Sequence, residues 1–210
     1  VQVTSTGATT KNAALNGTVT KAAGSIAFTD FNAVDHYEAE LAGSSVDVTL
    51  KTTVTGDGAI SYSRSPAAGS SAISSTTTTA TFRATTVGTW TVTATLAAST
   101  NYTGTSTTCQ VIVYKADRFY DNIHPDVQAF MDITLPIEKR GSYTAPDLMD
   151  ADKGSANCVE KHYKFMGWIT KANAEAGLAN DDAYKAVLIP AGTDMTATGT
   201  NYYAVWAEEE

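Results

Sequence analysis

The sequence predicts a mainly β protein in two parts, a two-sheet β-sandwich followed by a smaller module of strands and short helices. Apolar and polar residues alternate through much of the chain, as strands with one buried face require. No window before residue 115 keeps the 3.6-residue period of a helix. Composition changes at the same place, because residues 1–115 contain 27 threonines and residues 116–210 contain 7. These observations divide the chain near residue 115.

Charge is divided at the same place. Residues 1–115 contain 6 basic and 6 acidic side chains, and subtraction from the totals of 14 and 22 leaves 8 and 16 for residues 116–210. The whole formal charge of −8 therefore belongs to the second part. An acidic chain without a basic cluster is repelled by phosphate groups, so we expect no nucleic-acid partner. No apolar run reaches the roughly 20 residues of a membrane-spanning helix, so we expect no membrane insertion.

The clearest strand of the first part covers residues 89–96, in which every even position is apolar and every odd position is Thr. Its buried face should include Trp90. The same alternation, interrupted by turn residues, predicts strands at residues 46–50, 60–63, 80–84 and 109–114, with weaker candidates at 25–28 and 37–41. Such spacing is typical of a sandwich over residues 25–115. Residues 1–24 match no pattern and are interpreted as a linker or the remnant of a preceding module.

Two aromatic strands organise the second part, at residues 162–169 and 201–208. Each has an aromatic or apolar residue at every second position, and each ends near a Trp. Burial of one large side chain contributes roughly 1.5–3 kcal/mol, so a small module depends on a few such residues. Together with Trp90 in the first part, the predicted structural core consists of Tyr163, Phe165, Trp168 and Trp206.

The other elements of the second part are less regular. Residues 115–117 are interpreted as a short hinge. Apolar residues at three- and four-residue steps between positions 117 and 131 predict one or two short amphipathic helices, with an irregular aromatic strand as the alternative. Alternation predicts strands at residues 131–135 and 143–148. The expected remainder is an acidic loop at residues 147–154, a long polar connection at 171–184 and a further short element at 186–190.

Both parts resemble modules of bacterial surface proteins. Residues 79–82, 88–95 and 101–102 resemble the closing strands of bacterial Ig-like domains. Over residues 131–207 the chain resembles the Listeria–Bacteroides repeat family, the small β-grasp-like modules of internalin B repeats, through Tyr163, Phe165, Gly167, Trp168, Tyr203, Ala204 and Trp206. The family's Gly-rich opening is absent, and the connection after Lys171 is longer. The resemblance implies an Ig-like sandwich at residues 25–115 and a β-grasp-like module at residues 116–210.

The sequence contains no convergent set of catalytic residues, so we expect no enzyme. None of the common nucleophile, phosphate-loop, dinucleotide or zinc-protease motifs occurs. The competing hypothesis is a small hydrolase that uses His124 with Asp121 or Asp126. Residues 147–154 do not form an EF-hand, because Gly154 and Lys161 stand where oxygen ligands are needed. We therefore expect no metal and no cofactor.

The two cysteines leave two interpretations open. Cys109 shares the inward face of its strand with Val111 and Val113, so it can be a buried thiol that behaves as a small hydrophobe. A disulfide between Cys109 and Cys158 would instead join the two parts. Closing a loop of about 50 residues adds roughly 4 kcal/mol, provided that the two Cα atoms lie within about 7 Å.

The favoured function is a non-catalytic structural and binding segment of a bacterial surface or secreted protein. Such a segment would be extracellular and monomeric, space other domains, and present loops to an unidentified extracellular protein or glycan. The start at Val1, without a signal peptide, indicates a piece of a longer protein. The alternative is a carbohydrate-binding accessory module of a larger glycan-degrading enzyme. The surface aromatics available for that role are Tyr102, Tyr120, Tyr184 and one of Tyr202 or Tyr203.

Overall fold

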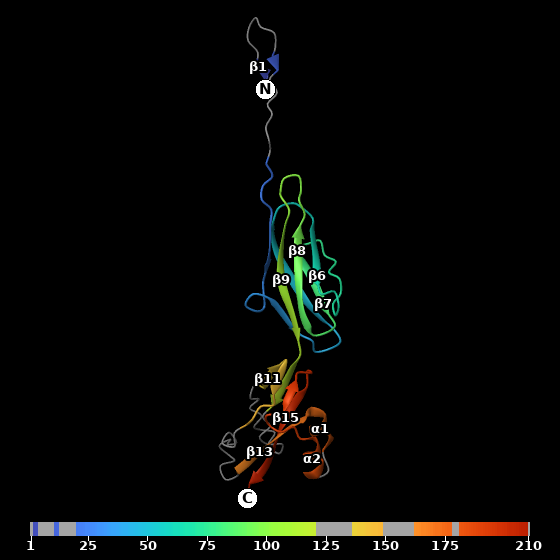
Figure 1. Cartoon of the computed structure of the whole chain (residues 1–210), viewed down its shortest axis with the longest axis vertical. Helices are drawn as coiled ribbons and strands as arrows, with labels where there is room; N and C mark the ends of the chain where they lie inside the picture. The colour runs from blue at the N-terminus through green and yellow to red at the C-terminus, as the bar shows by residue number, and fades with distance from the viewer. Residues whose placement is uncertain are drawn as a thin grey trace.

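The structure is a computed structural model that describes residues 2–3, 11–12, 20–120, 136–148, 162–177 and 181–209. Over these residues the chain is mainly β, with two short helices, α1 and α2. The buried apolar side chains form two clusters, one between Ile26 and Val113 and the other between Phe119 and Ala204. We call the parts built around them the N-terminal unit and the C-terminal unit. Figure 1 shows the two units end to end along the long axis.

The N-terminal unit consists of two sheets that share one core. The first sheet has the antiparallel order β3-β5-β7, formed by Ser25–Thr29, Val46–Thr55 and Thr79–Ala84. The second has the order β4-β9-β8-β6, formed by Tyr37–Glu40, Thr105–Tyr114, Gly88–Leu96 and Ile60–Ser65. β4 is parallel to β9, whereas the other pairs of this sheet are antiparallel. Alternate side chains of both sheets, among them Leu50, Phe82, Val92 and Val111, are fully buried in the core.

Two buried aromatic side chains, Trp90 and Tyr37, also make hydrogen bonds from this core to the surrounding backbone. Trp90 is 2% exposed, packs against Phe82 with ring centroids 5.3 Å apart, and donates from Nε1 to the carbonyl oxygen of Ala68 at 3.1 Å. The hydroxyl of Tyr37 on β4 donates to the carbonyl oxygen of Thr29 and accepts from the N–H of Lys51 on β5 at 3.1 Å. Tyr37 therefore joins the two sheets through hydrogen bonds as well as apolar contact.

The C-terminal unit is built on a four-stranded mixed sheet with the order β11-β10-β15-β13. Its strands are Ile137–Arg140, Ala116–Tyr120, Asn201–Glu209 and His162–Thr170. β10 and β15 are parallel, whereas the outer pairs are antiparallel. A two-stranded sheet pairs β12 (Ser142–Thr144) with β14 (Asp194–Thr196).

Aromatic rings form the centre of the C-terminal unit. Phe119 stacks on Tyr202 with centroids 4.8 Å apart and meets Trp168 edge to face at 4.9 Å. Trp168 is 0% exposed, and its Nε1 donates to the carbonyl oxygen of Pro146 at 2.7 Å. Phe165 and the half-buried Trp206 pack against this cluster. Tyr163 lies on β13, and its side chain is outside the described part of the structure.

The second half of the chain differs from the sequence expectations in several places. Of the two alternatives for the stretch from residue 117, the strand is correct for residues 117–120 and the helix is wrong there. These residues belong to β10, with Asp117 and Phe119 buried and Arg118 and Tyr120 half-buried. The connection expected at residues 171–184 contains α1 (Lys171–Ala176), capped by Thr170, and the start of α2 (Asp181–Val187). Strands β11 and β14 were not predicted. Residues 121–135, with the predicted strand at 131–135, lie outside the described residues.

Near the N-terminus, two residue pairs, Gln2–Val3 (β1) and Lys11–Asn12 (β2), form a short antiparallel ladder. Ala22 then makes a parallel bridge with Tyr102, so the described backbone meets the N-terminal unit before β3 begins. The N–H of Ala22 donates to the carbonyl oxygen of Asn101 at 2.8 Å.

The two separate clusters predict that truncation of one indole destabilises one unit. Trp168→Ala should cost about 3–5 kcal/mol and lower the melting transition of the C-terminal unit. Trp90→Ala should affect the N-terminal unit by a similar amount, because each ring contacts only its own cluster. Calorimetry of both variants tests this prediction, and equal loss of both transitions in each variant would contradict it.

The junction between the two units as candidate functional site

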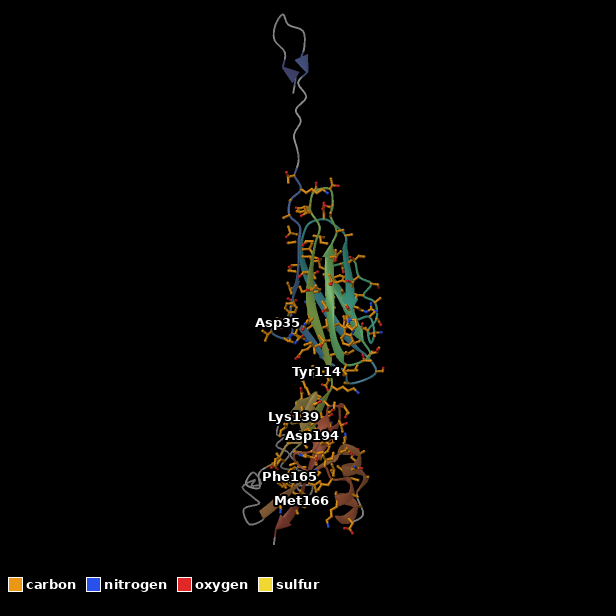
Figure 2. The ribbon with its side chains drawn as sticks, viewed as in Figure 1. Asp35, Tyr114, Lys139, Phe165, Met166 and Asp194 are labelled. Atoms are coloured by element: carbon orange, nitrogen blue, oxygen red, sulfur yellow. The ribbon has the colours of Figure 1, made fainter. Side chains whose placement is uncertain are left out.

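A single residue, Lys115, separates the last strand of the N-terminal unit from the first strand of the C-terminal unit. β9 ends at Tyr114, which lies at the junction in Figure 2, and β10 begins at Ala116. Ala116 and Asp117 are both 0% exposed. The connection expected at residues 115–117 is therefore reduced to Lys115, because Ala116 and Asp117 already belong to a buried strand of the next sheet.

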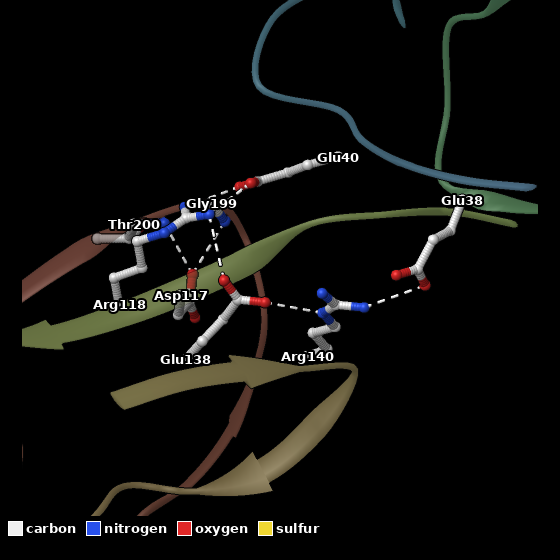
Figure 3. Close-up of polar contacts among 8 residues, drawn as sticks. All are labelled: Glu38, Glu40, Asp117, Arg118, Glu138, Arg140, Gly199 and Thr200. Atoms are coloured by element: carbon white, nitrogen blue, oxygen red, sulfur yellow. Dashed lines mark hydrogen bonds and ion pairs between the residues drawn. The ribbon is translucent and has the colours of Figure 1, made fainter. Parts of the chain in front are cut away.

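Five charged side chains form a chain of ion pairs across this junction (Figure 3). We call them the ionic chain, and they are Glu40, Arg118, Glu138, Arg140 and Glu38. Arg118 holds Glu40 through two parallel bonds of 2.8 and 2.5 Å and also donates to Glu138 at 3.3 Å. Arg140 donates to Glu138 at 2.8 Å and to Glu38 at 3.2 Å. The contacts to Glu38 and Glu40 join the two units.

Strand register places these side chains beside one another. Glu38 and Glu40 are two residues apart on β4, so they lie on the same face of that strand. Arg118 is directly opposite Glu138 in the antiparallel pair of β10 and β11. The guanidinium of Arg140 also lies over the ring of Tyr114 at 3.7 Å, a cation–π contact between the units.

The geometry of the ionic chain favours a role in orientation. An isolated surface ion pair contributes only about 0–1 kcal/mol. A bidentate arginine–carboxylate pair adds directional preference, because two parallel bonds fix the relative planes of both groups. The side chains of Arg118 and Glu40 are only 28% and 23% exposed, which limits screening. The hydrogen bonds from Arg118 also lower the pKa of Glu40 below its ordinary value.

A buried carboxylate holds the first strand of the C-terminal unit in place. Asp117 accepts the backbone N–H groups of Thr198, Gly199 and Thr200 at 2.9, 2.9 and 2.7 Å on one oxygen. Its other oxygen accepts the hydroxyl of Tyr143 at 2.5 Å. Burial and this hydrogen bond raise the pKa of Tyr143. Because both oxygens are bonded within the protein, Asp117 is suited to fixing β10 rather than to acid–base chemistry.

The structure describes only part of the residues considered for disulfide formation or catalysis. Cys109 is a free thiol, 7% exposed, and burial raises its pKa to about 12, so it is protonated at neutral pH. Its proposed partner Cys158 lies outside the described residues, as do His124, Asp121 and Asp126. Within the described part of the chain, no group of three or more His, Cys, Asp or Glu side chains could hold a metal ion.

The surface aromatics are dispersed. Tyr120 and Tyr203 are both half-buried and stack on each other with centroids 5.3 Å apart, whereas Tyr202 is 6% exposed and belongs to the core. A separate open depression of about 430 Å³ follows the β12–β14 ribbon. It is lined by Ser142, Tyr143, Thr144, Asp194, Met195 and Thr196. The hydroxyl of Tyr143 is already bonded to Asp117, which leaves Asp194 as the only other titratable side chain in that lining.

The ionic chain is not predictable from the sequence. Its members are neighbours in space but lie 78 residues apart for Arg118 and Glu40 and 102 residues apart for Arg140 and Glu38. The only local signal is the spacing of two between Glu38 and Glu40 and between Glu138 and Arg140, which places each pair on one face of a strand. That spacing predicts which charged side chains share a face, but it does not predict their ion-pair partners.

Comparison with models of known protein families, with curated proteins and with solved structures found no match to this chain. In the described residues, no helix has the length and apolar character needed to cross a membrane.

The lowered pKa of Glu40 predicts that acid weakens the junction. A carboxyl group whose pKa is lower in the folded state stabilises the protein above its ordinary pKa, and this contribution is lost as pH falls through the lowered value. The difference in unfolding free energy between the native chain and Glu40→Gln should be constant above about pH 5 and shrink in stronger acid. Chemical denaturation across this pH range measures it, and a difference that stays the same down to pH 3 would contradict the prediction.

Proposed function

We propose that this chain is a non-catalytic spacer segment of a bacterial surface or secreted protein, in which two folded units are held at a fixed angle. One observation carries the proposal. A one-residue connection is braced by the ionic chain and by the contact of Arg140 with Tyr114. Flexible linkers between domains are usually polar, exposed and longer. A braced connection instead fixes the position of one unit relative to the other.

Strand topology supports an Ig-like assignment for the N-terminal unit. The first part of its chain divides between the two sheets, because β3 pairs with β5 whereas β4 pairs in parallel with the last strand, β9. Seven strands in two sheets around one core suit such a sandwich. This is the kind of unit that surface proteins use as a spacer, and it agrees with the sequence resemblance.

The C-terminal unit has features that support a β-grasp-like assignment. The first and last strands of its main sheet, β10 and β15, are parallel neighbours at the centre, and an antiparallel strand lies beside each. Helix α1 contacts both β13 and β15. The proposal places this unit outside the cell as a monomeric module with no cofactor.

Exposed surfaces of the N-terminal unit support a role in contact with water and extracellular molecules. The outward side chains of β8 include Thr89 and Thr91, which are exposed, and their cross-strand neighbours include Gln110 and Ser65. Around Thr91 this face presents hydroxyl and amide groups, whereas Glu38 and Glu40 lie on the same face at the β4 edge of the sheet. Such a surface keeps an elongated segment hydrated, and its loops can present contacts to a protein or glycan.

The proposed function predicts one preferred orientation of the two units in solution. Replacing Arg118 and Arg140 by Gln removes both charges while keeping most of each side chain. Small-angle scattering of the native chain should fit a single arrangement, whereas the double variant should need a broader range of orientations with both units still folded.

The matched control is Arg83→Gln, because Arg83 makes a comparable pair with Asp47, at 2.6 Å, on the surface of the N-terminal unit. This control should scatter like the native chain. The proposal would be contradicted if scattering of the native chain could be fitted only with a broad range of orientations. It would also be contradicted if the double variant scattered like the native chain.

A further inference from the structure

Each unit ends on a strand that lies beside an earlier parallel strand of the same unit. In the N-terminal unit, β4 pairs with β9 from Tyr37 opposite Val111 to Glu40 opposite Tyr114. In the C-terminal unit, β10 pairs with β15, and Phe119 is opposite Tyr202. The chain enters the C-terminal unit at the first strand of its pair, whereas in the N-terminal unit β3, which is antiparallel to β5, precedes β4. It leaves each unit by the second strand of the pair. Along the whole segment, the path from one end to the other crosses both parallel pairs in series.

This arrangement determines how tension acts on the hydrogen bonds. Pulling the chain ends apart draws the amino end of one strand and the carboxyl end of its parallel partner in opposite directions along the strand axis. The bonds of a parallel ladder are evenly spaced, so they share this load and must break nearly together. When two neighbouring strand ends are instead pulled sideways, the bonds break one after another. A shear contact of this kind resists force better than the same bonds opened in sequence.

We propose that the segment resists tension along its long axis, with the β4–β9 and β10–β15 pairs acting as two shear contacts in series. This inference rests on the spacer function proposed above and adds a mechanical activity to it. Lys115 is the only residue between β9 and β10, so tension passes directly from the last strand of one unit into the first strand of the next.

Additional bonds reinforce both contacts at the points where force enters or leaves. In the C-terminal unit, the N–H of Arg118 donates to the carbonyl oxygen of Thr200 at 3.0 Å. Asp117 adds three further bonds to the turn that leads into β15. In the N-terminal unit, the N–H of Leu41 donates to the carbonyl oxygen of Tyr114 at 2.8 Å.

The amino-terminal approach to the N-terminal unit is also bonded in parallel to the strand that leaves it. Ala22 donates to Asn101 and accepts from the N–H of Thr103 at 2.9 Å, just before β9 begins. The charge-assisted bonds of Asp117 are the strongest of these reinforcements, since hydrogen bonds to an ionised group are roughly twice as strong as neutral ones.

The direct experiment is single-molecule unfolding of the full chain with two placements of the handles. In the first, handles at the two chain ends load β10–β15 in shear, and they load β4–β9 in shear once β3 has separated from β5. In the second, one handle is moved to an unnatural amino acid at Gly43, which is exposed and has open space around it. Force between position 43 and the carboxyl end then acts on the adjacent carboxyl ends of β4 and β9, and peels those strands apart. Only the loading direction in the N-terminal unit changes.

At equal force, the N-terminal unit should unfold at least about tenfold more slowly in the first placement, a difference of roughly 1.4 kcal/mol in the barrier. The C-terminal unit is sheared in both placements, so it serves as an internal control and its rate should stay the same. Equal rates for the N-terminal unit in the two placements would overturn the proposal for that unit.

Variants test each contact separately. Asp117→Asn removes the charge while keeping an acceptor oxygen, and it should speed forced unfolding of the C-terminal unit by about tenfold, as loss of roughly 1.4 kcal/mol would. Ala39→Pro removes a backbone donor of β4. That donor points toward β9, because Leu41, two residues on, donates to Tyr114. The Ala39→Pro variant should therefore speed forced unfolding of the N-terminal unit alone.

Control variants separate mechanical from general destabilisation. Ile169→Val on β13 and Phe82→Leu on β7 are core changes outside the paired terminal strands of their units. Each test variant should lose more resistance to force than its control for the same loss in chemical denaturation. Equal effects would overturn the proposal. Because scattering of the unloaded chain is independent of these measurements, a weak response to force with a single orientation in solution would reject the mechanical role and leave the spacer function standing.

Discussion

The strand that begins at Ala116 is the constraint on which both the C-terminal unit and the junction depend. Its inward side chains, Asp117 and Phe119, bind the turn before β15 and fill the aromatic core. Its outward side chain, Arg118, holds Glu40 of the other unit. Because alternate residues of a strand face opposite sides, fixing the buried carboxylate also fixes the direction of the guanidinium. One short strand thus couples the internal packing of one unit to its orientation against the other.

Charge and topology have complementary roles in this arrangement. The members of the ionic chain are 23% to 44% exposed and lie within 3.3 Å of their partners, well inside the screening length of about 8 Å at physiological salt. They set an angle but contribute modestly to stability. Cohesion comes from the two apolar cores, and resistance along the axis follows from parallel strand order. Orientation, cohesion and resistance to tension therefore have separate structural sources, and no single strong contact is needed to make the segment stiff.

Local sequence patterns predicted nearly the whole of β8, where burial alternates throughout, but only residues 46–50 of β5 and 109–114 of β9. They left β10 undecided, because the spacing of Phe119, Tyr120 and Ile123 fits a helix as well as a strand and only pairing with β11 and β15 decides. Helices α1 and α2 have six and seven residues, too few for a clear period. The ionic chain could not be predicted, since its partners meet only after both units have folded and docked.

A braced junction requires that the two units keep one relative orientation in solution. Residual dipolar couplings of backbone amides in a weakly aligning medium test this most directly, because each rigid body reports its own alignment tensor. If the units are held as described, couplings from residues 25–114 and from the described residues of the C-terminal unit will fit one common tensor in the present geometry. Two tensors of clearly different magnitude would contradict it, because they would show that the units turn independently about Lys115.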